Sequence, residues 1–152
     1  MPNLQPVPAA IAGMSQNAIE MVRALEDFSL AHCPQVEIET SHVLHGGMYA
    51  RTIMVPAGVV LTGALIKVAT LFIVNGHATI FVEGGSMEVS GYAVIPAGAG
   101  RKQAGLAHTD THFTMILPTD ARTIEEAERA FTDEHEKMFS HHAPNHVVIT
   151  GE

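Results

Sequence analysis

The chain has 152 residues, a length typical of one domain with its own core. Hydrophobic residues make up 47% of it and charged residues 16%, so we expect a homo-oligomer that covers part of an apolar surface. The formal net charge is −8 and no basic cluster occurs, which argues against nucleic-acid binding. No apolar run is long enough to cross a bilayer, and the start lacks the parts of a signal peptide, so we expect no membrane association and no secretion by a signal peptide.

The N-terminal part of the chain predicts an arm followed by a helix. Residues 1–13 contain three prolines and are expected to form an extended arm. Ser15 is a suitable N-cap for a helix over 15–32, and the helix has an apolar face at near-helical spacing, made of Ile19, Val22, Leu25, Phe28 and Leu30. The helix must end before Pro34. The only cysteine, Cys33, excludes an intrachain disulfide and is interpreted as a buried, unreactive thiol.

Residues 35–117 predict a β-barrel. Short apolar runs alternate with glycine-containing turns at the spacing of a small barrel. Two Pro-Ala-Gly sequences, beginning at Pro56 and Pro96, are interpreted as matching corners of this barrel. A loop is expected over 42–47, and the predicted strands are 36–40, 49–55, 59–61, 71–74, 78–82, 87–89 and 107–117.

The C-terminal part predicts a second helix and a tail. Thr123 and Glu126 have the spacing of a capping box, which opens a helix over 123–139. The tail, 140–152, contains a short apolar run that could pair as a strand with a neighbouring chain. The single domain therefore covers 14–139. Its helix-strands-helix order predicts a mainly β fold, a double-stranded β-helix or jelly roll with a helix at each end.

Two features resemble known proteins. The Pro-x-Gly sequences at Pro56 and Pro96 resemble the turns that precede the metal motifs of the cupin superfamily. The block 49–63, with 33–38 before it and 105–120 after it, is similar to small cupin-like proteins of tailed bacteriophages and prophages. The resemblance implies an RmlC-like jelly-roll fold and a location in the virion or in the cytoplasm of a bacterial host.

The resemblance also implies that the usual metal ligands are missing. The phage relatives carry histidines at the positions of Ile66, Thr70 and Leu117, and the general cupin pattern expects one at Arg101. Isoleucine and leucine cannot bind a metal, and threonine is a poor ligand. We therefore predict a degenerate metal site and no cofactor. The alternative is a divalent transition metal held by histidines from the set His42, His45, His77 and His112.

Four residues are candidates for binding a ligand: Tyr49, Arg51, Arg101 and Lys102. Tyr49 and Arg51 share one face of a predicted strand, and a guanidinium in a barrel mouth could bind a carboxylate, a phosphate or a sugar. The competing interpretation is that Arg51 pairs with an acid such as Asp110 and only stabilises the barrel.

The remaining histidines form two patterns. His108, Asp110 and His112 alternate along a predicted strand, but the outer two would lie about 13 Å apart, too far for one ion. One of them could still join His42, His45 or His77. A second group, interpreted as part of a solvated tail, comprises His135, His141, His142 and His146.

The primary functional hypothesis is a non-enzymatic phage or prophage protein. It would be a virion component or an accessory binding and packing module, and its partners would be further copies and other phage structural proteins. The alternative is a cupin-type small-molecule enzyme or binder, an isomerase, lyase or dioxygenase with a rearranged histidine site. A sugar-binding jelly roll is disfavoured because the chain has no Trp and two Tyr.

Overall fold

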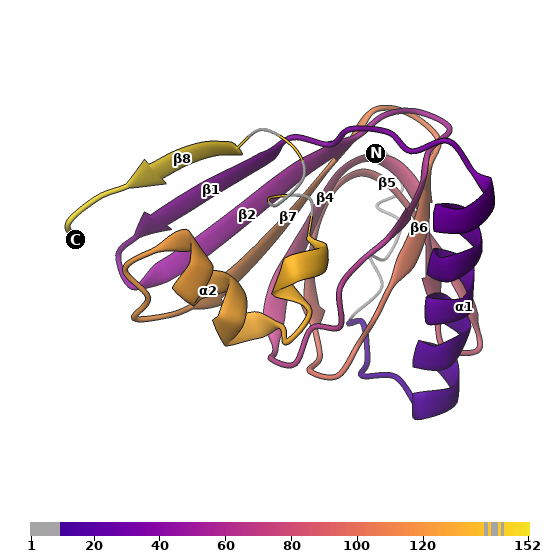
Figure 1. Cartoon of the computed structure of the whole chain (residues 1–152), viewed down its shortest axis with the longest axis horizontal. Helices are drawn as coiled ribbons and strands as arrows, with labels where there is room; N and C mark the ends of the chain where they lie inside the picture. The colour runs from indigo at the N-terminus through magenta and orange to yellow at the C-terminus, as the bar shows by residue number, and fades with distance from the viewer. Residues whose placement is uncertain (1–9, 139, 141–142, 144) are drawn as a thin grey trace, which may run out of the picture.

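The strands form one curled sheet whose order is β3-β6-β4-β7-β2-β1-β8, with β5 paired to β4 (Figure 1). The computed structural model describes residues 10–138, 140, 143 and 145–152. In chain order the elements are α1 (Gln16–His32), β1 (Thr40–His45), β2 (Met48–Val55), β3 (Val60–Thr62), β4 (Thr70–Val82), β5 (Gly85–Ala97), β6 (Ala104–Ala107), β7 (Thr111–Pro118), α2 (Ile124–Phe131), the 3-10 turn η1 (His135–Lys137) and β8 (Asn145–Ile149). The predicted mainly β fold with two helices is confirmed, and the curled sheet is consistent with a jelly roll.

Strand β4 joins the two halves of the sheet. Its first half pairs with β7 and its second half with β6, while β5 follows it along the whole length. The change of partner occurs at Gly76, where a side chain would collide with Thr111 and where φ is +147°. Only glycine adopts this conformation at such a close approach. The turn predicted at Asn75-Gly76 is therefore a bend within one long strand.

The predicted strand over 36–40 and the loop over 42–47 are both wrong. The strand is Thr40–His45, and its residues alternate between buried and exposed. It pairs with β2 through a tight turn at Gly46 and Gly47, which both have positive φ. A two-residue hairpin of this kind favours glycine at both positions. The hairpin therefore extends the strand into the region that the sequence pattern assigned to a loop.

The two Pro-Ala-Gly sequences do not form matching corners. Pro56-Ala57-Gly58 is a turn, whereas Pro96 and Ala97 are the last residues of β5. Proline is tolerated there because no other strand pairs with the side of β5 that faces away from β4, where only the bridge from Ile11 reaches it and the Pro96 carbonyl accepts from the Ile11 amide (2.8 Å). The predicted strand 107–117 is also divided, since residues 108–110 form a connection between β6 and β7.

The helices lie on different parts of the sheet. Ser15 caps α1 by accepting a hydrogen bond from the Ala18 amide (3.2 Å). Of the predicted apolar face, Ile19 and Val22 are buried, whereas Phe28 and Leu30 are exposed. Cys33 is exposed rather than buried, because the helix ends there and the chain leaves it through an exposed segment.

The second helix is shorter than the predicted 123–139. It ends at Phe131, since Thr132 is extended and donates a hydrogen bond to the Leu65 carbonyl (2.7 Å). Thr123 caps its start, as predicted, by accepting from the Glu126 amide (3.2 Å). The tail strand β8 pairs in parallel with β1 of the same chain. Within the part of the chain that is described, no helix is long and apolar enough to span a membrane.

Two apolar clusters make up the core. The larger fills the barrel and includes Val55, Val74, Ile80 and Ile95. The smaller lies between the concave face of the sheet and α2, where Phe131 packs with Tyr49 and Leu117. In Figure 1, α2 covers β2 and β7 on this concave face. The opposite face of the same strands carries no helix in the described part of the chain.

Candidate functional site

The positions that correspond to cupin metal ligands come together in the interior. Ile66 and Arg101 form an isolated β-bridge, and Arg101 donates a hydrogen bond to the Thr70 hydroxyl (2.7 Å). Thr70 and Leu117 occupy the next position of two antiparallel strands beyond the pair Leu71 and Ile116. The four positions therefore lie near one another, and none of these four side chains is a good metal ligand.

Arg101 itself occupies this region. Its side chain is 1% exposed and also donates to the Gly98 carbonyl (2.7 Å), the Val68 carbonyl (3.4 Å) and Gln103 (3.2 Å). Burial lowers the pKa of the guanidinium to about 10, which leaves it charged at neutral pH. A fixed cation bonded to protein oxygen atoms thus stands near the position that the resemblance assigns to a metal.

Lys102 connects three segments of the chain. Its ammonium group, in a residue that is completely buried, donates to Glu26 on α1 (3.2 Å), to Glu134 (3.0 Å) and to the Gly63 carbonyl (2.8 Å). Burial alone would raise the pKa of Glu134, but the hydrogen bond and charge of Lys102 lower it overall. Lys102 therefore holds α1 and the segment after α2 against the barrel.

Tyr49 and Arg51 belong to a buried polar network. Arg51 donates to Glu128 on α2 (2.8 Å) and to the Tyr49 hydroxyl (3.4 Å). The acid partner is Glu128 rather than the suggested Asp110, whose carboxylate instead accepts from the Ala57 amide (2.9 Å). Burial raises the pKa of Tyr49 to about 12, so the phenol stays protonated.

His42 completes this network. Its Nε2 contacts the Asn145 side-chain oxygen (2.6 Å), which can only accept, so Nε2 carries the proton and Nδ1 accepts from Tyr49 (2.6 Å). Burial lowers the pKa of His42, which favours the neutral ring. All four ligand candidates named from the sequence thus lie in the interior with protein partners, and a ligand would have to displace those partners.

The histidines proposed as alternative metal ligands do not converge. His42 points inward, His45 bonds Thr150 on the surface (2.8 Å), and His112 lies on the outer face of β7. His135 is buried and His146 pairs with Glu39 (3.1 Å), while His141 and His142 lie outside the described residues. Of the four alternative ligands, only His77 belongs to a group of three potential metal ligands among the described residues.

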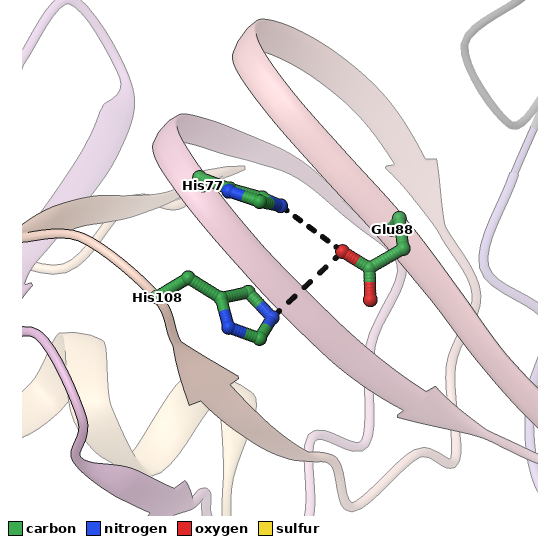
Figure 2. Close-up of side chains that lie close together, drawn as sticks. All are labelled: His77, Glu88 and His108. Atoms are coloured by element: carbon green, nitrogen blue, oxygen red, sulfur yellow. Dashed lines mark hydrogen bonds and ion pairs between the residues drawn. The ribbon is translucent and has the colours of Figure 1, made fainter.

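His77, Glu88 and His108 form a compact cluster on the outer surface (Figure 2). His77 lies on β4, Glu88 on β5 and His108 in the connection after β6, and one donor atom from each lies within 4.8 Å of the others. The Glu88 Oε2 is 3.2 Å from His77 Nε2 and 3.8 Å from His108 Nε2. The hydroxyl of Thr79 bonds both Glu88 and His108, and its bond lowers the pKa of Glu88 further than the His77 bond does.

The sequence pattern indicated this cluster only in part. It suggested that one histidine of the 108–112 group could join His77, and His108 does so. It did not identify Glu88, because Glu88 is brought beside His77 by the β4–β5 register, in which Thr79 faces Glu88 and His77 faces Ser90. The two described cavities lie elsewhere; the larger, of about 240 Å³, lies between the β1–β2 hairpin, residues 119–122 and the C-terminus.

No protein-family model matches the chain, and neither does any curated protein. Solved structures do resemble it. A cupin superfamily protein from Desulfitobacterium hafniense is 15% identical with a TM-score of 0.48, covering 60% of this chain and 86% of its own. KdgF from Halomonas sp. is 15% identical with a TM-score of 0.47, covering 57% and 84%.

A salicylate 1,2-dioxygenase from Pseudaminobacter salicylatoxidans is 14% identical with a TM-score of 0.44. It covers 76% of this chain and 39% of its own. Several of the similar solved structures are named as cupins, but the identities and the overlap are low. The fold therefore rests on the strand order, the register and the two helices of this chain, which together describe a cupin-like jelly roll.

Proposed function

We propose that this protein is a non-enzymatic packing module, a component of a phage or prophage virion or an accessory to one, which assembles through the outer face of its sheet. The phage setting is supported by the sequence block 49–63, which is similar to cupin-like proteins of tailed phages. The packing role is supported by the surface of the sheet, and the absence of an enzymatic role by its filled interior.

The observation that carries the proposal is a sheet face without charged residues. On the convex side of β1, β2, β7 and the adjoining parts of β4 (71–75) and β5 (92–96), the side chains are exposed or half-buried and none is Asp, Glu, Lys or Arg; Glu88, on the same side of β5, lies beyond this area. This outer face consists of Ser41, Val43, His45, Met48, Ala50, Thr52, Met54, Leu71, Ile73, Asn75, Tyr92, Val94, Pro96, His112, Thr114, Ile116 and Pro118. A solvated sheet face normally carries charges, so this composition favours a covered one.

A second copy of the chain is the occupant that the dimensions favour. Five strands at about 4.8 Å spacing and about six residues along each make a face of roughly 24 Å by 20 Å. The accessible surface of protruding side chains is larger than this flat area and is of the order of the ~800 Å² that each partner buries in a standard interface. A face without charges also meets its own copy without repulsion between like charges.

The interior supports a packing role. Arg101, Lys102 and Arg51 are each 8% exposed or less and are bonded to protein atoms. Apolar side chains fill the rest of the barrel. An interior of this kind stabilises the fold, and each of the four ligand candidates is already bonded to protein atoms.

The assembly is tested by placing a charge on the face. Leu71→Glu, at a side chain that is 45% exposed near the middle of the face, should convert the wild-type oligomer to monomer in light scattering coupled to gel filtration. Leu30→Glu is the matched control, because Leu30 is 64% exposed but lies on α1. A monomeric wild type, or dissociation by the α1 variant alone, would contradict the proposal.

The virion assignment has a separate test. Mass spectrometry of particles purified after prophage induction should find this chain in many copies per particle. If the chain is found only in the soluble fraction of the lysate, the virion role is excluded and only an accessory role is left. Oligomerisation and location can then fail independently.

A further inference from the structure

We propose that His77, Glu88 and His108 bind a zinc-class transition-metal ion on the outside of the barrel. This site is separate from the interior positions of the family pattern and does not depend on the proposed packing role. Two imidazole nitrogens and one carboxylate are the donor set of many three-residue zinc sites, and the same set suits cobalt and nickel far better than magnesium or calcium.

The distances fit an ion after small side-chain movements. Ligand atoms about 2.0–2.1 Å from a tetrahedral ion lie about 3.4 Å from one another. The Glu88 Oε2 lies 3.2 Å from His77 Nε2 and 3.8 Å from His108 Nε2. Figure 2 shows both imidazoles directed toward this one oxygen. Side-chain rotation is therefore sufficient, and no backbone movement is required.

The backbone around the cluster is well fixed. His77 and Glu88 lie on paired strands, one diagonal step apart in the register of β4 and β5. The His108 amide donates to the His77 carbonyl (2.8 Å), and the His77 amide donates to the Thr109 hydroxyl (3.1 Å). The three ligands thus come from three segments that are already bonded together.

Thr79 orients the carboxylate. Its hydroxyl is bonded to Glu88 Oε1, which leaves Oε2 facing the two histidines. It also contacts His108 Nε2 (2.7 Å), and an ion would replace this contact. A hydroxyl that holds the second oxygen of a ligating carboxylate is the usual kind of outer partner in metal sites.

The exposure of the cluster favours a structural role, in which the ion cross-links two segments of the chain. The side chains are 44%, 60% and 35% exposed for His77, Glu88 and His108. A fourth position is open to water, and neither described cavity adjoins the cluster. An ion would cross-link the β4–β5 hairpin to residues 108–110, the connection whose Asp110 holds the turn at Ala57. Binding to the folded state alone would raise the melting temperature.

The experiment titrates zinc into untagged protein that has been purified with a chelator and then freed of it. Calorimetry should show one zinc ion bound per chain at this site. The double variant His77→Ala/His108→Ala should remove this binding event. The variant should lower the affinity at least about 100-fold, as loss of ligands costs no less than loss of their outer partners. At a free zinc concentration of about 100 Kd, the melting temperature should rise by about 5–10 °C in the wild type only.

Two further variants make the result decisive. Glu88→Gln keeps the shape of the side chain and should weaken zinc binding while leaving the metal-free melting temperature unchanged. His146→Ala is the matched control, since His146 is also an exposed histidine paired with a glutamate, but it lies on β8 away from the cluster. Equal binding by the double variant, loss of binding by the control alone, or no binding by the wild type would each overturn the proposal.

Discussion

The interior of the fold contains charged side chains, whereas the outer face of its sheet contains none. Arg101, Lys102 and Arg51 are buried, each with its hydrogen bonds made within the protein. The outer face exposes Leu71, Tyr92 and Val94 and carries no charged side chain. In a monomeric protein the charges would be expected on the outside and the apolar groups inside.

This difference assigns the two regions different tasks. Buried, hydrogen-bonded cations are costly to desolvate and stabilise only the arrangement that satisfies them, so they specify how the segments meet. An apolar face without charges contributes nothing specific to the monomer and gains free energy only when it is covered. The interior therefore stabilises the fold of one chain, whereas the outer face is the surface through which we propose that copies associate.

The largest effect should follow the removal of the Arg101 guanidinium. Arg101→Ala leaves the Thr70 hydroxyl and the Gly98 carbonyl without their donor and opens a cavity, so the free energy of unfolding should fall by about 3–5 kcal/mol. Urea unfolding at fixed protein concentration measures it. The exposed Arg122→Ala should change it by less than about 0.5 kcal/mol. An Arg101→Ala variant as stable as the wild type would show that the cation is not needed for the fold.

A slightly smaller effect is expected for the pair of Arg51 and Glu128. Arg51→Met leaves the carboxylate buried without its cation and should cost about 3 kcal/mol. The double variant Arg51→Met/Glu128→Leu should recover most of that loss, because it removes both charges. The double-mutant cycle is measured by urea unfolding. If Arg51→Met instead stays as stable as the wild type, Arg51 is free to serve as a ligand group, as the enzyme hypothesis requires.

A fall in pH should lower the free energy of unfolding through protonation of His42. Burial lowers its pKa in the folded state, so the unfolded chain takes up the proton first, near pH 6.5. The contribution of neutral His42 is complete above that pH and is lost as the pH falls through the folded value. Between pH 6.5 and 5.5, this one group should lower the free energy of unfolding by at most about 1.4 kcal/mol per pH unit. In urea unfolding at several pH values, His42→Gln should reduce this dependence on pH, whereas His45→Gln, at an exposed position, should leave it unchanged.

The smallest effect should come from a charge on the outer face. Val94→Lys, measured at a concentration where the wild type is monomeric, should change the free energy of unfolding by less than about 0.5 kcal/mol, because Val94 is 46% exposed. At higher concentration the same variant should be less stable than the wild type, since it has lost the association. A large loss under dilute conditions would mean that this face supports the fold of the single chain.

Local pattern was sufficient for much of the fold. Ser15 and the run that ends before Pro34 predicted the first helix, and alternating apolar runs predicted a curled β structure. Residues 71–74 and 78–82 were predicted as two strands because Asn75-Gly76 has the sequence of a turn. In the structure they belong to one strand, and Gly76 leaves room for the close approach of Thr111. The sequence Asn75-Gly76 is compatible with both a turn and a bend within a strand. Which of the two forms depends on the segment that packs against the glycine.

Some contacts of the site residues could be predicted from the sequence, and others could not. The resemblance placed Ile66, Thr70 and Arg101 at one location from positions alone, and the structure brings them together. The partner of Arg51 was not predicted, because Glu128 lies on α2 and reaches β2 only when the helix packs on the sheet. Glu88 was not predicted for a similar reason, since the register of β4 and β5 decides which side chains are neighbours.

The sequence by itself determined the mainly β class, the start and end of the first helix, and the absence of histidine at positions 66, 70, 101 and 117. These depend on residue types and on spacing along the chain. Tertiary structure alone decided that the buried cations are hydrogen-bonded within the fold, that the outer face defined above lacks charge, and that His77, Glu88 and His108 meet. Each of these depends on contacts between segments that are distant in sequence, and such contacts are set by strand register and helix packing.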